Sequence, residues 1–265
     1  MSRCFIENAD NLVWLCENSA NTNYADGKGY NLIFADAPYN TGVIQKRDRT
    51  DGTVDHAYLD RYGDNYKEFL YPRLQAFHKA LLPNGSLMLK LDWHEVHYAK
   101  VWLDEIFGSR ECFKNEIIWA YDYGARQKNV WPRKHDTILW YTKDPNNYTF
   151  NYDSIDRLPY MAEGRQTAER AELGKTPTDV WWQTIVPTQG REKTGYNSQK
   201  PHQILDRIIR VHTKKDDWVL DPFAGSGTTG ESCLKLDRNC VMLDINPAAV
   251  AVMRKRFSIV QQEFL

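Results

Sequence analysis

Short apolar runs alternate with amphipathic segments along most of the chain. The apolar runs, rich in β-branched and aromatic residues, predict strands at residues 31–35, 86–91, 116–120, 137–141, 218–220 and 240–243. Apolar residues spaced three and four apart predict helices at residues 66–82, 95–107, 201–212, 228–236 and 247–257. This alternation favours an α/β fold, with a doubly wound, mostly parallel sheet that carries helices on both faces.

Two segments do not fit the alternation. Residues 41–65 are polar and rich in Gly, Asp and Arg, and residues 144–198 carry scattered charge. A loop of such length inside a compact domain is usually functional or partly disordered. We therefore expect a single domain over residues 1–265, with a mobile loop at 41–65 and an inserted region at 144–198.

Composition adds a few limits. A chain of 265 residues can build one α/β domain with a sizeable core. The formal net charge of -1 leaves nucleic-acid binding open, because a local basic stripe matters more than the total. The five cysteines form no CxxC pair, which argues against a zinc site and a disulfide framework. The pattern of a signal peptide and an apolar run of about 18 residues are both missing, so we expect a cytoplasmic protein.

A glycine-rich loop follows the predicted strand at 218–220. Gly225, Gly227 and Gly230 fit G-x-G-x-x-G between a strand and a helix, where backbone can approach a ligand and free N–H groups can bind it. A phosphate loop would carry a lysine where Thr228 stands. A dinucleotide-binding half would need more strands than residues 231–265 provide, unless earlier strands complete the sheet. A purely structural turn is the remaining alternative.

Carboxylates stand at the ends of two predicted strands near this loop. Asp244 could accept hydrogen bonds from both ribose hydroxyls of a nucleoside cofactor, or it could simply cap the helix that starts at Pro247. Asp221 also ends a strand, and Phe223 could pack on an adenine ring.

The loop Asp36-Ala37-Pro38-Tyr39 ends the first predicted strand, at the edge where open α/β sheets bind ligands. Proline fixes its own φ and restricts the residue before it. The Asp36 carboxylate and the Ala37 carbonyl can then be aimed at one point and hold both hydrogens of an –NH₂ group, while Tyr39 stacks on the base that carries it. An ordinary strand-end turn is the alternative.

Together these segments resemble the beta-class amino-methyltransferases of DNA, which use S-adenosyl-L-methionine. That family carries Asp-Pro-Pro-Tyr where this chain has residues 36–39, and residues 221–229 (Asp-Pro-Phe-Ala-Gly-Ser-Gly-Thr-Thr) are similar to its cofactor loop. Residues 194–201 (Thr-Gly-Tyr-Asn-Ser-Gln-Lys-Pro) are similar to the segment before that loop, and residues 116–119 and 135–139 also resemble family segments. The family's order places the catalytic loop before the cofactor loop, which accounts for the short chain after Gly230.

The resemblance implies a Rossmann-like, circularly permuted methyltransferase fold that transfers a methyl group to the N6 amine of a flipped-out adenine. Cytosine N4 is the nearest alternative, and an RNA or protein amine, a nucleotide-dependent oxidoreductase or a catalytically silent DNA-binding homologue are more distant ones. The implied catalytic residues are Asp36, Ala37, Pro38 and Tyr39. The implied cofactor-binding residues are Asp221, Pro222, Phe223, Gly225, Gly227, Thr228, Asp244, Asn246, Gln199 and Lys200. Ala37 departs from the family's proline but still supplies a carbonyl.

A basic segment between two predicted strands surrounds Trp131. Its residues Arg126, Lys128, Arg133 and Lys134 are candidates for phosphate contacts with double-stranded DNA, although an ordinary solvated loop would look the same. The resemblance assigns target recognition to residues 144–198, and it suggests a homodimer and a partner restriction endonuclease in a bacterial or phage host.

Overall fold

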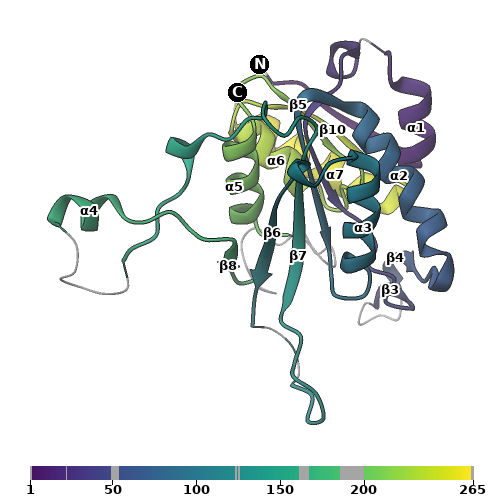
Figure 1. Cartoon of the computed structure of the whole chain (residues 1–265). Coiled ribbons are helices and arrows are strands. Elements are labelled where there is room, and N and C mark those ends of the chain that lie inside the picture. Colours follow the sequence, from purple (N-terminus) through teal and green to yellow (C-terminus); the bar gives the residue numbers. More distant parts are fainter. Residues whose placement is uncertain are drawn as a thin grey trace.

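The computed structural model describes residues 2–21, 23–48, 54–122, 124, 126–160, 167–185 and 200–263. An eight-stranded sheet runs through its centre in the order β1-β10-β9-β2-β5-β7-β6-β8 (Figure 1). The strands are β1 (Cys4–Asn8), β2 (Tyr30–Asp36), β5 (Leu81–Leu91), β6 (Phe113–Ala120), β7 (His135–Thr142), β8 (Val180–Trp182), β9 (Trp218–Asp221) and β10 (Asn239–Asp244). Only β7 runs antiparallel to its neighbours in this sheet. The predicted mostly parallel sheet is therefore confirmed.

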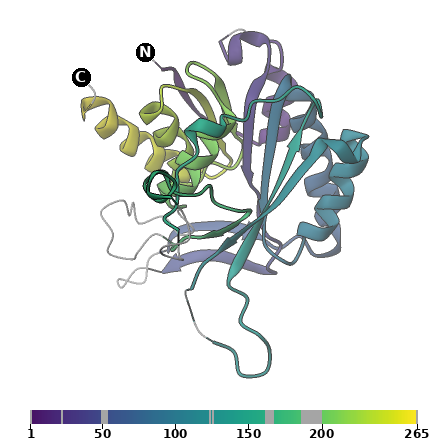
Figure 2. The same cartoon turned by 60° about the vertical axis from the view of Figure 1, so that its left-hand side comes forward.

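Helices cover both faces of the sheet, as the alternation predicted (Figure 2). The helices α1 (Asn11–Asn18), α2 (Tyr66–Ala80) and α3 (Val96–Phe107) pack on one face, and α5 (His202–His212), α6 (Thr228–Lys235) and α7 (Pro247–Glu263) on the other. Successive strand residues point to opposite faces. Ile33 accordingly joins the core under α2, while Phe34 joins the core under α5.

Some boundaries and elements differ from the prediction. Helix α2 ends at Ala80 rather than at 82, because Leu81 is extended and already pairs with Tyr30 in the sheet. Strand β1 and helix α1 were not predicted. β1 is an edge strand whose residues are half-buried or, at Asn8, exposed, so its apolar pattern is weak.

The segment predicted as a loop at 41–65 contains regular structure. Strand β3 (Val43–Asp48) pairs antiparallel with β4 (Val54–Asp60), apart from the main sheet, and residues 49–53 lie outside the described part of the chain. The polar composition that indicated an irregular loop is compatible with this strand pair because neither strand belongs to the central sheet.

The region predicted as an insertion, 144–198, is partly regular too. Helix α4 (Ala168–Leu173) lies away from the sheet (Figure 1), whereas β8 adds a last strand beside β6. Leu158 and Lys175 form a two-residue bridge between the arms of this region, with both N···O distances at 2.8 Å. Residues 161–166 and 186–199 are outside the described part. Across the described helices, none combines the length and apolar character needed to cross a membrane.

Candidate active site

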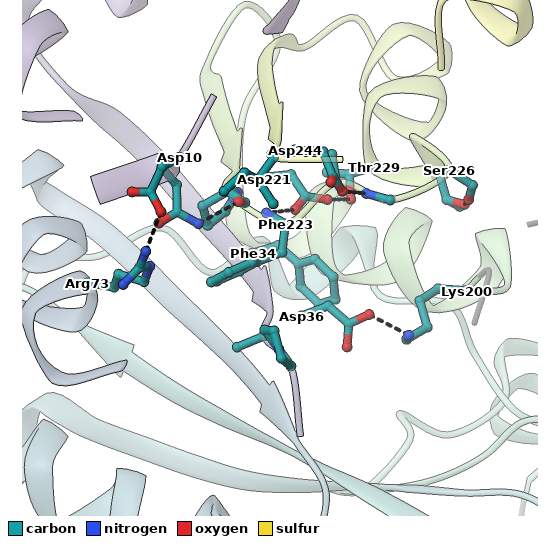
Figure 3. A pocket seen from close by; sticks show the side chains of 18 of the residues that line it. Asp10, Phe34, Asp36, Arg73, Lys200, Asp221, Phe223, Ser226, Thr229 and Asp244 are labelled. Carbon is teal, nitrogen blue, oxygen red and sulfur yellow. Dashed lines mark hydrogen bonds and ion pairs between the residues drawn. The ribbon is translucent and has the colours of Figure 1, made fainter. Parts of the chain in front are cut away.

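Three carboxylates stand at one edge of the sheet. β2, β9 and β10 are neighbours that run parallel, and they end at Asp36, Asp221 and Asp244. The carboxyl ends of parallel strands form the usual ligand-binding edge of an open α/β sheet. A cavity of about 320 Å³ opens there (Figure 3). Its lining includes the predicted residues Asp36, Ala37, Pro38, Tyr39, Lys200, Asp221, Pro222, Phe223, Gly225, Thr228 and Asp244. The fold thus brings both predicted motifs to one cavity.

Other predicted residues are not part of the cavity wall. Gly227 and Asn246 stand at the starts of α6 and α7, where the Asn246 amide donates to Asp244 Oδ1 at 2.8 Å and its side chain accepts from the Ala248 amide at 2.9 Å. Both are chain neighbours of residues that line the cavity, namely Ser226, Thr228 and Ile245. Gln199, with the rest of the 194–199 segment, lies outside the described residues.

The glycine-rich loop needs its glycines for backbone conformation and for packing. Gly225 and Gly227 have φ of 52° and 79°, in the left-handed region that favours glycine. A Cβ on Gly230 would lie 2.6 Å from Phe257 Cζ, so α6 can approach β10 and α7 only without a side chain at this position. The Gly225 amide donates to Asp244 Oδ2 at 2.9 Å, which ties the loop to the next strand.

Asp221 is a buried carboxylate whose partners are neutral. It accepts hydrogen bonds from the Thr229 hydroxyl at 2.5 Å and from the Phe223 amide at 3.1 Å. Burial raises the pKa of Asp221 to about 7, and the nearby Asp36 and Asp244 charges act in the same direction. Burial also raises the pKa of Asp244. A ligand with a positive charge or several hydrogen-bond donors would stabilise the ionised form of both carboxylates and lower their pKa.

The opposite wall of the cavity comes from α1 and α2, which contribute residues that sequence reasoning did not find. Asp10 caps α1 and forms an ion pair with Arg73, whose guanidinium lies 4.1 Å from the centre of the Phe69 ring. Asn11 donates to the Pro222 carbonyl at 2.8 Å, while its buried Oδ1 has no hydrogen-bond partner among the described residues. In the sequence, only Asp10 indicated this wall: an N-cap residue before an apolar run marks the start of a helix.

The two oxygens of the Asp36 carboxylate have different partners. Oδ1 accepts from the Tyr39 hydroxyl at 3.1 Å and lies 3.2 Å from Lys90 Nζ, whereas Oδ2 forms an ion pair with Lys200. Burial alone would raise the pKa of Asp36, but the Lys200 and Lys90 charges outweigh it and the pKa is lowered. The carboxylate is therefore ionised, and both of its oxygens can accept hydrogen bonds.

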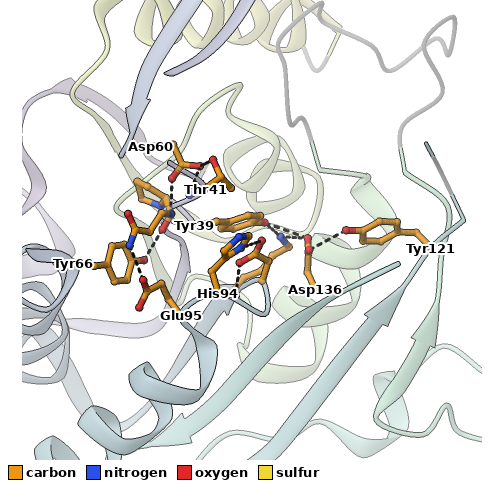
Figure 4. A network of polar contacts seen from close by, with 12 residues as sticks. Tyr39, Thr41, Asp60, Tyr66, His94, Glu95, Tyr121 and Asp136 are labelled. Carbon is orange, nitrogen blue, oxygen red and sulfur yellow. Dashed lines mark hydrogen bonds and ion pairs between the residues drawn. The ribbon is translucent and has the colours of Figure 1, made fainter. Parts of the chain in front are cut away.

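The chain after Tyr39 is held in place by a hydrogen-bond network (Figure 4). Asn40 has a φ of 60°, and its amide donates to Asp60 Oδ1 at 2.7 Å. Its side chain donates to Glu95 at 2.6 Å and accepts from the Tyr62 amide at 2.8 Å. Because Asp60 ends β4, the strand pair fixes the backbone that leaves the loop at residues 36–39. Sequence reasoning missed this role of 41–65.

A buried lysine lies beneath the same loop. Lys90 is fully buried, lies 2.5 Å from Asp136 Oδ2 and donates to the Tyr39 hydroxyl. Asp136 also accepts from the Tyr121 hydroxyl at 3.0 Å (Figure 4). The signal in the sequence was a single charged residue inside the apolar run at 86–91.

The predicted DNA-contacting residues lie in the β6–β7 connection, which projects beyond the ends of those strands (Figure 1). Arg133 stacks on the Trp93 ring at 3.9 Å, and Lys134 donates to the Gly124 carbonyl at 3.1 Å. Arg126 pairs with Asp122 at 2.7 Å, Lys128 is exposed, and Trp131 is 93% exposed. The connection therefore offers cations and an unburied ring outside the cavity. Within the described part of the chain, no group of three or more His, Cys, Asp or Glu side chains could hold a metal ion.

Comparison with known proteins decides the family. Residues 30–255 match the model of the DNA methylase family. This chain belongs to that family. It is 30% identical to the type II methyltransferase M.HpaI of Haemophilus parainfluenzae over 226 residues, which are 85% of this chain and 67% of that protein. It is 29% identical to the DNA adenine methyltransferase YhdJ of Escherichia coli K12 over 241 residues, which are 86% of this chain and 76% of that protein.

Solved structures of other methyltransferases share the fold of this DNA methylase. The M1.HpyAVI–SAM complex superposes with a TM-score of 0.64 at 21% identity, covering 96% of this chain and 98% of that one. The cytosine-N4-specific PvuII DNA methyltransferase superposes with a TM-score of 0.68 at 16% identity, covering 97% of this chain and 87% of that one. The Rossmann-like methyltransferase fold implied by the resemblance is thereby confirmed.

Proposed function

We propose that this DNA methylase transfers a methyl group from S-adenosylmethionine to the N6 amine of adenine in double-stranded DNA. The observation that carries the proposal is the single cavity into which both motifs open. Asp36 and Ala37 offer acceptors for an amine at one side of it, and Asp221 and Asp244 stand at the other. This arrangement suits a target amine and a methyl donor that bind side by side in one cavity.

The residues of the cavity fit the methyl donor. Asp244 can accept from ribose hydroxyls, the Phe223 ring can pack on an adenine ring, and Asp221 can face a cationic group. Asn11 Oδ1, which has no hydrogen-bond partner in the described part of the chain, adds an acceptor for one of the donor's N–H groups. Once bound, the cofactor supplies an electrophilic methyl group on a sulfonium. Pro222, Gly225, Thr228 and Lys200 would complete its site, and Gly227 and Asn246 would support its walls. The resemblance assigns Gln199 to the same site.

On the amine side, the chain positions the nucleophile. The target base must leave the duplex, because its amine is otherwise paired. Asp36 Oδ2 and the Ala37 carbonyl accept the two amine hydrogens, which favours a pyramidal nitrogen, while Tyr39 stacks on the base and Pro38 stiffens the loop. The nitrogen lone pair would form a bond to the methyl group that the bound cofactor supplies, and the amine proton held at Asp36 would be released through that carboxylate to solvent. Catalysis rests on positioning and electrostatics.

Adenine is favoured over cytosine by two observations. The first is that a relative matching 86% of this chain is named a DNA adenine methyltransferase. The second is that the loop begins with Asp36, where cytosine-N4 members of the beta class more often carry serine. Cytosine N4 remains the alternative, since the PvuII enzyme with the same fold is cytosine-N4-specific.

The proposal is tested by mass spectrometry of nucleosides from unmethylated DNA incubated with the protein and S-adenosylmethionine. We expect N6-methyladenine. N4-methylcytosine would move the target to the alternative base, and no modified base despite measurable cofactor binding would contradict the proposal.

Asp36→Ala provides the matched variant for the same assay. We expect it to abolish transfer while cofactor affinity stays within about threefold, because Asp36 faces the amine rather than the donor. A variant that methylates DNA at the normal rate would remove Asp36 from the catalytic assignment.

We further propose that residues 144–198 of the single domain contribute to target recognition. The described part of this region includes an arm that lies away from the sheet (Figure 1), where it can reach along a duplex. A homodimer and a partner endonuclease belong to the same proposal, since type II methyltransferases are among the relatives. Sedimentation of the protein with and without DNA tests the dimer.

A further inference from the structure

Lys90 connects the amine-binding loop to the strand beyond it. Its Nζ lies 3.2 Å from Asp36 Oδ1 and 2.5 Å from Asp136 Oδ2, and it donates to the Tyr39 hydroxyl. The side chain is 0% exposed. A fully buried ammonium is tolerated only when it is paired, and here all three partners belong to the loop or to a strand near it.

The sheet sets this arrangement. Asp36 and Lys90 are register partners on the adjacent parallel strands β2 and β5, so their side chains lie on the same face. Asp136 comes from β7, on the other side of β5. Three consecutive strands thus each place one charged group in the network, and their relative positions are as rigid as the sheet.

Lys90 acts from behind the cavity wall. Asp36, Tyr39 and Lys200 line the cavity, whereas Lys90 and Asp136 do not. Lys90 and the Tyr39 hydroxyl contact Asp36 Oδ1, which leaves Oδ2 turned towards Lys200 and the cavity. An incoming amine can therefore exchange with Lys200 at Oδ2 without disturbing Lys90.

We propose that Lys90, anchored by Asp136, is a positioning residue for methyl transfer, which holds the Asp36 carboxylate and the Tyr39 ring so that Oδ2 is presented to the target amine. The inference rests on the proposed function, because it assigns a role within the same reaction. It also assigns Lys90 an electrostatic role, since Lys90 stays beside Asp36 after the amine has displaced Lys200.

The charges around Asp36 set the expected pH dependence. The groups that face it are Lys90 from β5, Lys200 before α5, Tyr39 of its own loop, Asp136 from β7 and Asp221 from β9. Burial raises the pKa of Asp36, and the two lysines lower it. With Lys200 displaced and Lys90 removed, burial is no longer opposed and the carboxyl protonates at higher pH.

The test is the single-turnover rate of methylation of duplex DNA between pH 5 and 9, at saturating cofactor. We expect the acid limb of the Lys90→Met rate to lie roughly 1–3 pH units above that of the wild type. The plateau rate of the variant should also be lower by about 10- to 100-fold. Its cofactor affinity should not change. Lys100→Met is the matched control, because it breaks the 2.8 Å pair with Asp104 on α3, away from the cavity.

Two further variants separate positioning from simple charge neutralisation. The double variant Lys90→Met/Asp136→Asn removes both charges of this pair, so neither is left buried without its partner. If Lys90 served only to neutralise Asp136, the double variant should recover the wild-type rate and pH profile. We expect the rate to stay low, and full recovery would overturn the inference. If Lys90→Met does not fold, the nearly isosteric Asp136→Asn replaces it: a lowered plateau rate supports the anchoring role, and an unchanged rate overturns it.

The same assay distinguishes this inference from the proposed function. Wild-type protein that binds cofactor but methylates no DNA contradicts the proposed function, and the Lys90 inference fails with it. Wild-type transfer combined with unaltered Lys90→Met kinetics overturns the Lys90 inference alone.

Discussion

At the scale of single residues, the site is defined by carboxylates with different surroundings. Asp36 lies between two lysines and its pKa is lowered, whereas Asp221 has neutral hydrogen-bond donors and its pKa is raised to about 7. The first carboxylate is ionised and can accept hydrogen bonds. The second is costly to ionise until a ligand supplies positive charge, so ligand binding and stability are linked at Asp221.

Asp221→Asn should therefore stabilise the ligand-free protein at high pH. The folded-state pKa of Asp221 is above the ordinary value, so this group lowers the stability of the fold as the pH rises. The loss of stability is absent below about pH 4, grows with pH and is complete above about pH 7. We expect the variant to gain on the order of 2–4 kcal/mol at pH 8 and clearly less at pH 5. Thermal unfolding without cofactor at both pH values measures this. An equal effect at the two pH values would contradict the assigned pKa.

At the scale of elements, we propose that the β6–β7 connection contacts DNA. It starts and ends at the carboxyl edge of the sheet, the edge at which the cavity opens, and carries Arg133 against Trp93 and an exposed Trp131. Position and charge act together here, because basic side chains at this edge can hold the phosphates that flank a base entering the cavity.

Charge reversal in this connection should weaken DNA binding. For Arg133→Glu/Lys134→Glu we expect the slope of log affinity against log salt to fall by about 1 for each lost phosphate contact. Fluorescence anisotropy with a labelled duplex at several salt concentrations measures the slope. Lys214→Glu/Lys215→Glu, at exposed positions just before β9 at the opposite edge, is the matched control. Equal slopes for the two double variants would remove the connection from the DNA-binding surface.

At the scale of the whole molecule, the cavity joins distant parts of the chain. Its walls come from α1, β2 and α2 in the N-terminal half and from β9, α6 and β10 in the C-terminal half. A ligand bound there contacts both halves, so it should stabilise the domain as one unit.

S-adenosylmethionine should therefore raise the unfolding temperature in a single transition. At about 100 times its Kd we expect a gain of roughly 2.7 kcal/mol. Asp36→Ala should keep most of this gain, whereas Asp244→Ala should lose most of it at the same cofactor concentration. Differential scanning calorimetry compares the three proteins. An Asp244→Ala gain equal to that of the wild type would remove Asp244 from the cofactor site.

The amino-acid sequence by itself determined the alternation of strands and helices, the order of the two motifs and the family they resemble. These features are local, because periodicity and turn residues can be recognised within a short segment of the chain. The edge strand β1 and the polar strand pair β3–β4 were not predicted, because their local apolar pattern is weak.

Only the tertiary structure decided which side chains support the motifs. Lys90 is 54 residues from Asp36 along the chain, yet the two are register partners, and Asp60, Asn11 and Asp136 reach the site from other elements. Local periodicity specifies which residues are buried, but not which strands become neighbours. The partners of a buried charge follow from strand order and register, and these are fixed only when the whole sheet assembles.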